Sequence, residues 1–209
     1  MNRIKSQNIL PPSIKSLNEM SSDVCDLVSF LKKEIKIDIT SDREFVQSYE
    51  RDWSNMPGYA DAVARPINSV ECAILLYLFS KSDISITISA GKTNLTGSAT
   101  PESGLLISTE LMISPKSKIN IESKTVKVPI GEILENVREK ILSDSNNKLY
   151  YPVDPTSRKD ARVGGTISCN ASGFIPGEKG ATRYWVESLS VLLVNGQLIK
   201  AKRGEYVSE

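Results

Sequence analysis

The chain has 209 residues, with 26 Lys and Arg against 25 Asp and Glu, a net charge of +1, three Cys and no His. This length suits one large domain or two small lobes around a buried core. The even charge balance excludes a broad basic surface, so we expect no nucleic-acid partner. Without His, the commonest general base and metal ligand are missing, so we predict no metal site and expect a bound cofactor to supply any chemistry.

The sequence predicts neither a membrane span nor a secretion signal. The longest apolar run, Cys72 to Phe79, is too short to cross a bilayer, and the first eight residues lack the apolar centre of a signal peptide. Cys25, Cys72 and Cys169 are widely spaced and odd in number, which argues against a disulfide framework and a zinc site. We therefore expect a soluble, cytoplasmic chain with free thiols.

Residues 1–57 are predicted to form an N-terminal helical segment. Apolar residues recur at helical spacing over 24–35, and Ser21 or Ser22 can cap that helix. A weaker helical pattern covers 44–53.

The next helix has the clearest start signal in the chain. Asn68 can accept hydrogen bonds from the first turn, and Glu71 can return one to the N–H of the cap residue. Apolar residues over 73–79 form the body of this helix. The period then changes over 84–89, where Ile alternates with Ser and Thr, which predicts a strand with one buried face.

The remaining elements alternate between strand and helix. An Asn-Gly pair near the end predicts a hairpin turn with positive φ at both positions. The predicted elements are strands at 105–107, 119–121 and 126–128, a helix over 133–142, and a hairpin over 191–199 that turns at Asn195-Gly196. This mixed order predicts an α+β fold.

Two segments rich in small residues each lie next to an extended apolar stretch. The first runs over 88–97 and contains Gly91-Lys92-Thr93, and the second runs over 161–173 and contains Gly164-Gly165. Small side chains allow the backbone to approach a flat ligand closely. The sequence therefore suggests a chain folded around a large, planar and phosphorylated molecule.

Other interpretations of these segments remain open. A P-loop would need Gly five residues before Gly91, where the chain has Ile86. The first segment is then either an ordinary surface turn or a nest of backbone N–H groups for an anion, with added charge from Lys92. The second segment could be a small-residue helix packed against a sheet, and no G-x-G-x-x-G supports a Rossmann site.

Taken together, these passages resemble the FAD-binding domain of the vanillyl-alcohol-oxidase type, or PCMH type, in the branch of the glycolate oxidase D-subunit and D-lactate dehydrogenase. The resemblance runs from about Tyr59 to the C-terminus. The passages that carry it occur in the family order: 66–70, 89–97, then 154–155 with 163–165 and 170–173, and finally 186–196.

The resemblance implies a two-lobed α+β domain over 58–209 with FAD between its lobes. A smaller N-terminal α/β lobe would cover about 58–125. A larger lobe, with a mixed or antiparallel sheet flanked by helices, would cover about 126–209.

The resemblance also implies the cofactor contacts. Backbone N–H groups of the first loop would hold the diphosphate, at Ser89, Ala90, Gly91, Lys92, Thr93 and Asn94, with Gly97 and Ser98 beside it. The second stretch would line the ribityl chain and isoalloxazine ring, at Asp154, Pro155, Thr156, Gly164, Gly165, Ser168 and Gly173. Each charge-assisted N–H contact to phosphate contributes roughly 1.5–3 kcal/mol.

The chain departs from the family pattern at three points. Lys92 stands where the family has Gly, so it either contacts phosphate or crowds the loop. The Tyr-Gly pair that usually follows the second stretch reads Lys179-Gly180. Because the chain has no His, a histidyl-linked flavin is impossible and noncovalent FAD is expected, with a bond through Cys169 as the alternative.

The implied function is oxidation of a 2-hydroxy acid, such as lactate or glycolate, by hydride transfer to FAD. The alternatives are another flavoenzyme, such as an enolpyruvyl-sugar reductase or the flavin subunit of a molybdenum hydroxylase, or a non-catalytic protein that has lost FAD. In the resembled enzymes a substrate domain with His and Arg residues follows, whereas this sequence stops at Glu209. We therefore expect the substrate to be bound by a further domain or a partner subunit, and we assign no catalytic residue here.

Overall fold

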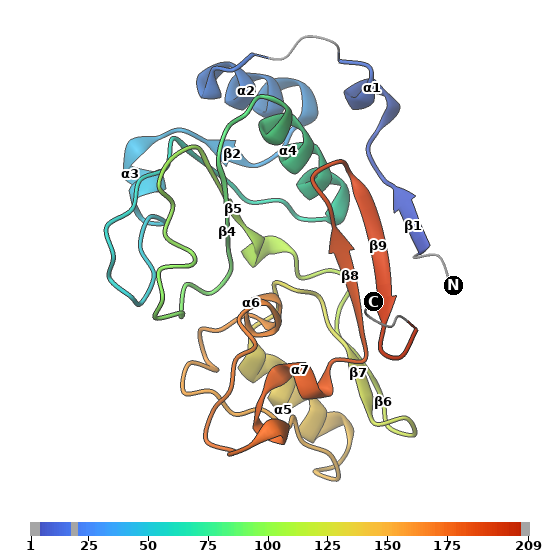
Figure 1. Ribbon diagram of the computed structural model, residues 1–209. Coiled ribbons are helices and arrows are strands. Elements are labelled where there is room, and N and C mark those ends of the chain that lie inside the picture. Colours follow the sequence, from blue (N-terminus) through green and yellow to red (C-terminus); the bar gives the residue numbers. More distant parts are fainter. Residues whose placement is uncertain (1–4, 18–20, 206–209) are drawn as a thin grey trace.

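The computed structural model describes residues 5–17 and 21–205 (Figure 1). Its elements are β1 (Lys5–Asn8), α1 (Pro12–Lys15), α2 (Val24–Phe30), the π-helix η1 (Leu31–Ile35), β2 (Ile39–Thr40), α3 (Arg43–Gln47), β3 (Ala62–Ala64), α4 (Ser69–Lys81), β4 (Ile86–Ser89), β5 (Leu105–Ser108), the 3₁₀-helix η2 (Thr109–Leu111), β6 (Lys118–Asn120), β7 (Thr125–Lys127), α5 (Leu134–Asp144), α6 (Val163–Ser168), the 3₁₀-helix η3 (Glu178–Gly180), α7 (Thr182–Trp185), β8 (Ser188–Leu192) and β9 (Gln197–Lys202). Within the described ranges, no helix is long and apolar enough to cross a membrane.

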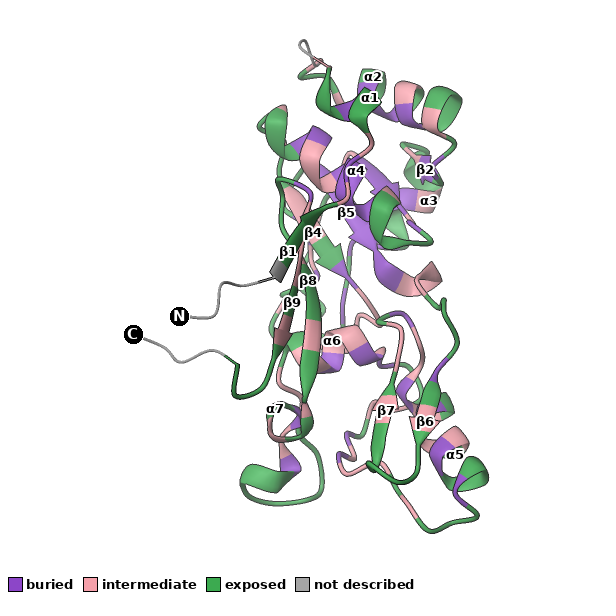
Figure 2. Cartoon of the chain, turned by 90° about the vertical axis from the view of Figure 1, so that its right-hand side faces the viewer, coloured by how far each residue is buried: buried purple, intermediate pink, exposed green. Residues whose placement is uncertain are grey.

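A four-stranded sheet forms the centre of the first lobe, in the order β2-β3-β5-β4. Strand β5 runs parallel to β3 on one side and to β4 on the other, while β2 is antiparallel to β3. Helix α4 connects β3 to β4, as expected for parallel strands. Leu105, Leu106 and Ile107 are 0% exposed, and Figure 2 shows this sheet within the main buried region. Such continuous burial is typical of strands covered on both faces.

The two faces of this sheet bury different residues. Ala62, Ala64, Leu105 and Ile107 belong to the same apolar core as α2 and α4. Val63 and Leu106 point the other way, into a smaller cluster that includes Val46 and Tyr49. The predicted strand at 105–107 and the predicted helix after Asn68 are therefore confirmed, and together they build the main core.

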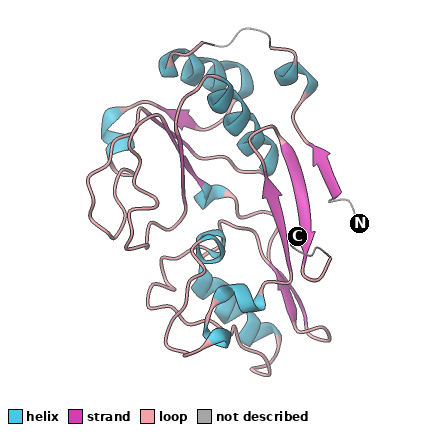
Figure 3. Ribbon diagram, viewed as in Figure 1, coloured by secondary structure: helices cyan, strands magenta, loops and turns pink. Residues whose placement is uncertain are grey.

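The second lobe has its own helices (Figure 3) and a separate apolar core. Leu134, Val137 and Ile141 lie on one side of α5 and pack with Val163 of α6. The predicted helix over 133–142 is thus confirmed as an amphipathic helix with one buried face. The hairpin β6–β7 closes over the same core. The molecule therefore has the two-lobed α+β architecture that the sequence predicted.

The C-terminal hairpin β8–β9 returns alongside the first lobe and forms a three-stranded antiparallel sheet with β1. Its turn differs in detail from the prediction: Gly196 has φ of +78°, but Asn195 is not among the residues with positive φ. The N–H of Leu193 donates to Gln197 O, so the turn is followed by a bulge at glycine. The predicted hairpin is present with this longer turn.

The N-terminal part of the chain is less helical than the sequence suggested. Residues 1–57 contribute β1 and β2 as well as helices. The helix predicted over 44–53 is wrong in extent, because α3 ends at Gln47. Beyond that point the side chains of Glu50 and Asp52 accept hydrogen bonds from the N–H groups of Ala60 and Ala99, which an extended helix could not satisfy.

The side chains at the helix ends correct two local expectations and confirm a third. Asp23, and not Ser21 or Ser22, caps α2 by accepting hydrogen bonds at its N-terminus. Asn68 caps α4 as predicted. Glu71, however, accepts from the N–H of Ile67, the residue before the cap.

The strand predicted over 84–89 is β4, but its buried face is incomplete. Ile84 and Ile86 are partly buried against the main core. Ile88 is 49% exposed, so the expectation that all three isoleucines face the core is wrong. The alternation of apolar and polar residues does not predict burial there because β4 is an edge strand, which has a neighbouring strand on one side only.

Candidate functional site

The first small-residue segment begins where β4 ends, at the carboxyl end of a pair of parallel strands. This is the position where open α/β sheets commonly bind ligands. Ser89 is 1% exposed, and its Oγ has no hydrogen-bond partner among the described residues. The carbonyl of Ser89 accepts a hydrogen bond from Thr109 Oγ1, which fixes the start of the loop against β5 and η2.

Four successive backbone donors follow. Within the described parts of the chain, the N–H groups of Gly91, Lys92, Thr93 and Asn94 have no acceptor. Lys92 lies in the left-handed region with φ of +55°. A run of N–H groups that includes a left-handed residue forms a concave donor surface for an anion. This arrangement favours the anion nest over an ordinary surface turn.

The far end of the first loop is held by its own side chains. Asn94 Oδ1 accepts hydrogen bonds from the N–H groups of Thr96 and Ser98, at 3.2 and 3.0 Å. Gly97 has φ of +76°, and a Cβ there would lie 2.6 Å from the Sδ of Met56. A surface hollow of about 420 Å³ lies beside this end of the loop, lined by Met56, Pro57, Gly58, Tyr59, Gly97, Thr100, Pro101 and Glu102.

The second small-residue segment contains the short helix α6, so the alternative reading of this segment as a helix is correct in part. Its Val163 packs against helix α5, in a core that the β6–β7 hairpin shares, while its two glycines contact loop residues. The N–H of Gly164 donates to Ile130 O at 2.8 Å, and a Cβ on Gly164 would lie 2.8 Å from that of Ile130. A Cβ on Gly165 would lie 3.2 Å from the Cβ of Ala90 in the first segment.

The two segments also meet at Gly91. A Cβ added to Gly91 would lie 2.3 Å from Asp160 O and 3.1 Å from the Cα of Ala161. Two stretches that are far apart in the sequence therefore lie in direct contact, and both contacts require a very small residue. This juxtaposition brings Ala90 and Gly91 together with Gly165.

The other predicted residues of the second stretch form a group of their own. A Cβ on Gly173 would lie 1.9 Å from Asp154 O, and the N–H of Phe174 donates to the same carbonyl at 3.2 Å. Pro155 is buried beside them. Thr156 and Ser168 are exposed.

An ion-pair ring fixes Asp154 to helix α5. Asp154 Oδ1 lies 2.9 Å from Arg158 Nη1 and 3.4 Å from Arg138 Nη2. Glu135 Oε2 lies 2.9 Å from Arg158 Nε and 3.3 Å from Arg138 Nε. Sequence reasoning did not find this ring, because its four members come from two separate segments.

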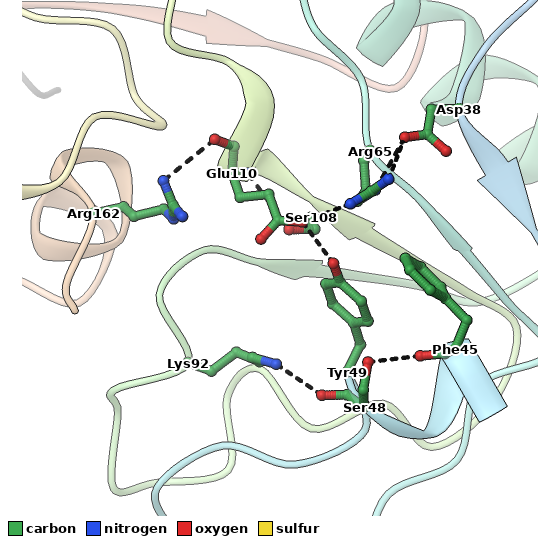
Figure 4. Close-up of polar contacts among 9 residues, drawn as sticks. All are labelled: Asp38, Phe45, Ser48, Tyr49, Arg65, Lys92, Ser108, Glu110 and Arg162. Atoms are coloured by element: carbon green, nitrogen blue, oxygen red, sulfur yellow. Dashed lines mark hydrogen bonds and ion pairs between the residues drawn. The ribbon is translucent and has the colours of Figure 1, made fainter.

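Sequence reasoning also missed the partners of Lys92 (Figure 4). Its Nζ donates to Ser48 O at 2.8 Å and lies 4.6 Å from the centre of the Tyr49 ring. Its carbonyl accepts a hydrogen bond from Trp53 N–H at 3.0 Å. Partial burial lowers the pKa of the Lys92 ammonium, and the Glu110 carboxylate acts in the opposite direction. The only sequence signal was the Lys itself, in a place where the resembled family has Gly.

A polar chain extends from Tyr49 across the end of the sheet (Figure 4). The hydroxyl of Tyr49 donates to Glu110 Oε1 at 2.6 Å, and Arg65 lies 3.6 Å from the same carboxylate oxygen. Arg65 also pairs with Asp38 at 2.7 Å. Burial and the hydrogen bond to Glu110 raise the pKa of Tyr49. Arg162, just before α6, donates to Glu110 O at 3.2 Å and so links the two lobes.

Comparison with known proteins identifies the family. Residues 60–202 match the family described as FAD binding domain. The chain belongs to this family. It is 32% identical over 157 residues to glycolate oxidase subunit GlcD of Bacillus subtilis (strain 168), covering 74% of this chain and 32% of that protein. It is 26% identical over 140 residues to D-lactate dehydrogenase of Anaerostipes hadrus, covering 67% of this chain and 29% of that protein.

Solved structures share the fold at low sequence identity. Alkyldihydroxyacetonephosphate synthase has a TM-score of 0.71 at 16% identity, covering 93% of this chain and 38% of that one. Xylooligosaccharide oxidase from Myceliophthora thermophila C1 has a TM-score of 0.68 at 17% identity, covering 84% and 37%. The chain thus spans about a third of the length of the relatives that it matches.

The residues present fit FAD, the cofactor of this family. The four N–H groups of residues 91–94, which have no acceptor among the described residues, suit a diphosphate. Successive backbone N–H groups form a concave surface that binds the oxygens of an anion. The glycines at 91 and 165 remove the side chains that would otherwise fill the junction of the two segments. Cys169 is exposed at the end of α6, and the chain has no His, so the histidyl linkage is excluded.

Proposed function

We propose that this chain is the FAD-binding part of an oxidoreductase that oxidises a 2-hydroxy acid, and that it holds FAD noncovalently. The N–H groups of Gly91 to Asn94 would hold the diphosphate, with Ser89 and Ala90 at the start of the loop. The second stretch, around Gly165 and Gly173, would line the ribityl chain and the flavin ring. The observation that carries this assignment is the contact of the two small-residue segments beside a row of N–H groups that have no acceptor in residues 5–17 and 21–205.

The chain's own residues would bind and orient the cofactor. FAD supplies the redox chemistry, by accepting a hydride equivalent from substrate. The loop donors would fix the diphosphate, and Arg162 of the second lobe would link the lobes by donating to Glu110 O of the first. The groups that bind the hydroxy acid and remove its proton would come from a further domain or a partner subunit, because the match covers only 32% and 29% of these two relatives.

The substrate class rests on the relatives. Their names include glycolate oxidase, D-lactate dehydrogenase and D-2-hydroxyglutarate dehydrogenase, the last from Xanthomonas citri at 29% identity. All three substrates carry a hydroxyl on the carbon next to a carboxylate. We therefore propose a small 2-hydroxy acid as the electron donor.

Cofactor binding is tested by reconstitution. The protein is incubated with FAD and desalted, and the retained visible flavin absorption and the melting temperature are measured. We expect near-stoichiometric retention and a rise in melting temperature. FMN, which lacks the diphosphate, should bind at least about a hundredfold more weakly, because it cannot engage the whole donor row. Colourless protein with an unchanged melting temperature would instead support the non-catalytic alternative.

The substrate is tested on the reconstituted protein together with the remaining domain or its partner. Glycolate, D-lactate and D-2-hydroxyglutarate are added without oxygen, and bleaching of the flavin absorption is followed. Bleaching by one of these acids supports the proposal. Bleaching by NADPH or by a purine, and by none of the acids, would instead point to a different flavoenzyme on the same domain.

We also propose a cytoplasmic location. All three cysteines are free thiols, which is typical of a reducing compartment. Immunodetection after cell fractionation tests this, and recovery in a membrane or organelle fraction would contradict it.

A further inference from the structure

Residues 48–53 contact the first loop at several points, although they precede the matched region at 60–202. We propose that this segment is a brace that fixes the diphosphate loop, with Lys92 as its main link. In this inference, which rests on the proposed role of the loop in FAD binding, Lys92 is a positioning residue whose ammonium binds the brace instead of phosphate.

The side chain of Lys92 makes two contacts with the brace. Its Nζ donates to Ser48 O at 2.8 Å, and Ser48 is the C-cap residue of α3. The carbonyls at a helix end lack partners within the helix, so an ammonium group is a suitable donor for them. The same Nζ lies 4.6 Å from the centre of the Tyr49 ring, within the range of a cation–π interaction.

The backbone of the loop is tied to the same segment at two further points. The N–H of Trp53 donates to Lys92 O at 3.0 Å. The buried carboxylate of Asp52 accepts the N–H of Ala99 at 3.2 Å, beyond the far end of the donor row. The brace therefore holds the loop on both sides of the donors at Thr93 and Asn94.

The brace is itself anchored to the sheet. Tyr49 is 8% exposed, packs with Val63 and Leu106, and donates its hydroxyl to Glu110. Because the Tyr49 ring is fixed, its contact with the Lys92 ammonium holds the Lys92 side chain in one orientation. This arrangement explains how Lys stands in a left-handed conformation that otherwise favours Gly, since the contacts of the side chain offset the backbone strain.

The test is a double-mutant cycle on FAD affinity. Lys92→Met and Tyr49→Leu are made singly and together, and the Kd for FAD is measured by flavin fluorescence. If both residues act through one contact, each substitution weakens binding about tenfold and the double variant is no weaker than the worse single one. Lys92→Arg, which keeps the charge, should restore most of the affinity. Lys33→Met, at an exposed position on η1, is the control and should leave the Kd unchanged.

Three outcomes would overturn the brace. If Lys92 binds phosphate directly, Lys92→Met weakens FAD while Tyr49→Leu does not, or the two effects add. If Lys92 merely crowds the loop, Lys92→Gly tightens FAD binding. An unchanged Kd in Lys92→Met would show that the link has no role.

A measurement on the FAD-free protein separates this inference from the proposed function. Hydrogen exchange of the Trp53 amide reports the bond to Lys92 O, and we expect it to become at least about tenfold faster in Lys92→Met. Wild-type protein that fails to bind FAD would refute the proposed function, and the exchange rate would still decide the brace. Equal exchange rates of the Trp53 amide in wild type and Lys92→Met would contradict the brace. This comparison does not depend on whether Tyr49→Leu folds.

Discussion

A Cβ atom on Gly165 would lie 3.2 Å from the Cβ of Ala90, so the helix α6 of one lobe touches the loop after β4 of the other. This separation is shorter than ordinary van der Waals contact between carbon atoms, and interiors packed this closely tolerate little added volume. The contact at Gly91 is tighter, because there the neighbour is a backbone carbonyl, that of Asp160.

These two contacts predict different costs for the same substitution. Gly91→Ala would place a methyl 2.3 Å from Asp160 O, so the loop or the Asp160 turn must move. We expect it to lower the free energy of unfolding by about 1–3 kcal/mol. Gly165→Ala meets only the methyl of Ala90, and we expect a loss below about 1 kcal/mol. Urea unfolding of both variants measures the difference.

The same pair of variants also tests the cofactor assignment. Gly91→Ala should weaken FAD binding by about tenfold or more, because it displaces the first donor of the row. A Gly91→Ala protein that matches wild type in both stability and FAD affinity would show that the segments do not meet as described.

Elements governed by local sequence were predictable. Helix α4 has its cap at Asn68 and its apolar body in adjacent residues, and the α5 helix shows its buried face in the period of its apolar residues. The small-residue segments were also recognisable, because a run of Gly, Ala, Ser and Thr can be read directly from the sequence. Their contact at Gly91 and Gly165 supports their predicted role in binding one ligand.

Features that depend on distant residues were not predictable. The pairing of β1 with β9 joins the two ends of the chain, and no local pattern encodes such a partner. The local pattern over 44–53 predicts a helix, whereas the Asp52 carboxylate accepts a hydrogen bond from the distant N–H of Ala99. Lys92 could be identified as unusual, but its partner Ser48 could not, because the contact exists only after the loop folds back on α3.

The ion-pair ring predicts a larger cost for losing Glu135 than for losing an exposed carboxylate. Glu135→Gln would remove the negative charge that the guanidinium groups of Arg138 and Arg158 both approach. The four side chains of the ring are 23–33% exposed, so solvent screening limits the effect, and we expect a loss of about 1–2 kcal/mol in the free energy of unfolding. The matched control is Asp144→Asn in the exposed pair with Lys140, which should cost less than about 0.5 kcal/mol. Equal losses in thermal unfolding would show that the ring has no special role.

Acid should destabilise the segment around Glu50 and Asp52. Burial raises the pKa of Asp52. The hydrogen bonds that its carboxylate accepts from Ser54 and from the Ala99 N–H together lower this pKa by a larger amount, so the net pKa lies below the ordinary value of 3.8. Burial likewise raises the pKa of Glu50, while its contacts with Arg43 and the Ala60 N–H bring it below 4.5. A carboxyl group with a lowered pKa binds fewer protons in the folded state than in the unfolded state. It therefore stabilises the fold fully at a pH above its ordinary pKa. This stabilisation is lost as the pH falls through the lower pKa of the folded state.

The measurement for this pH dependence is the urea midpoint between about pH 7 and pH 3. We expect a flat region at the upper end and a decline that begins near the ordinary values of 4.5 and 3.8. Asp52→Asn should lower the midpoint at pH 7 and flatten the decline. Glu102→Gln, at an exposed position, should leave both unchanged. A wild-type midpoint that rises on acidification would contradict the assigned sign.

The three thiols should divide into two classes. Cys72 is 9% exposed on the buried side of α4, and burial raises the pKa of its thiol to about 11. Because the thiolate is the reactive form, Cys72 should react with a disulfide reagent at about pH 8 at least about a hundredfold more slowly than Cys25 and Cys169, which are exposed. Absorbance of the released thiol should show two fast equivalents, and a third only in urea. Cys72→Ala should remove the slow equivalent alone, whereas three equal rates in the folded protein would place Cys72 at the surface and remove it from the core of the first lobe.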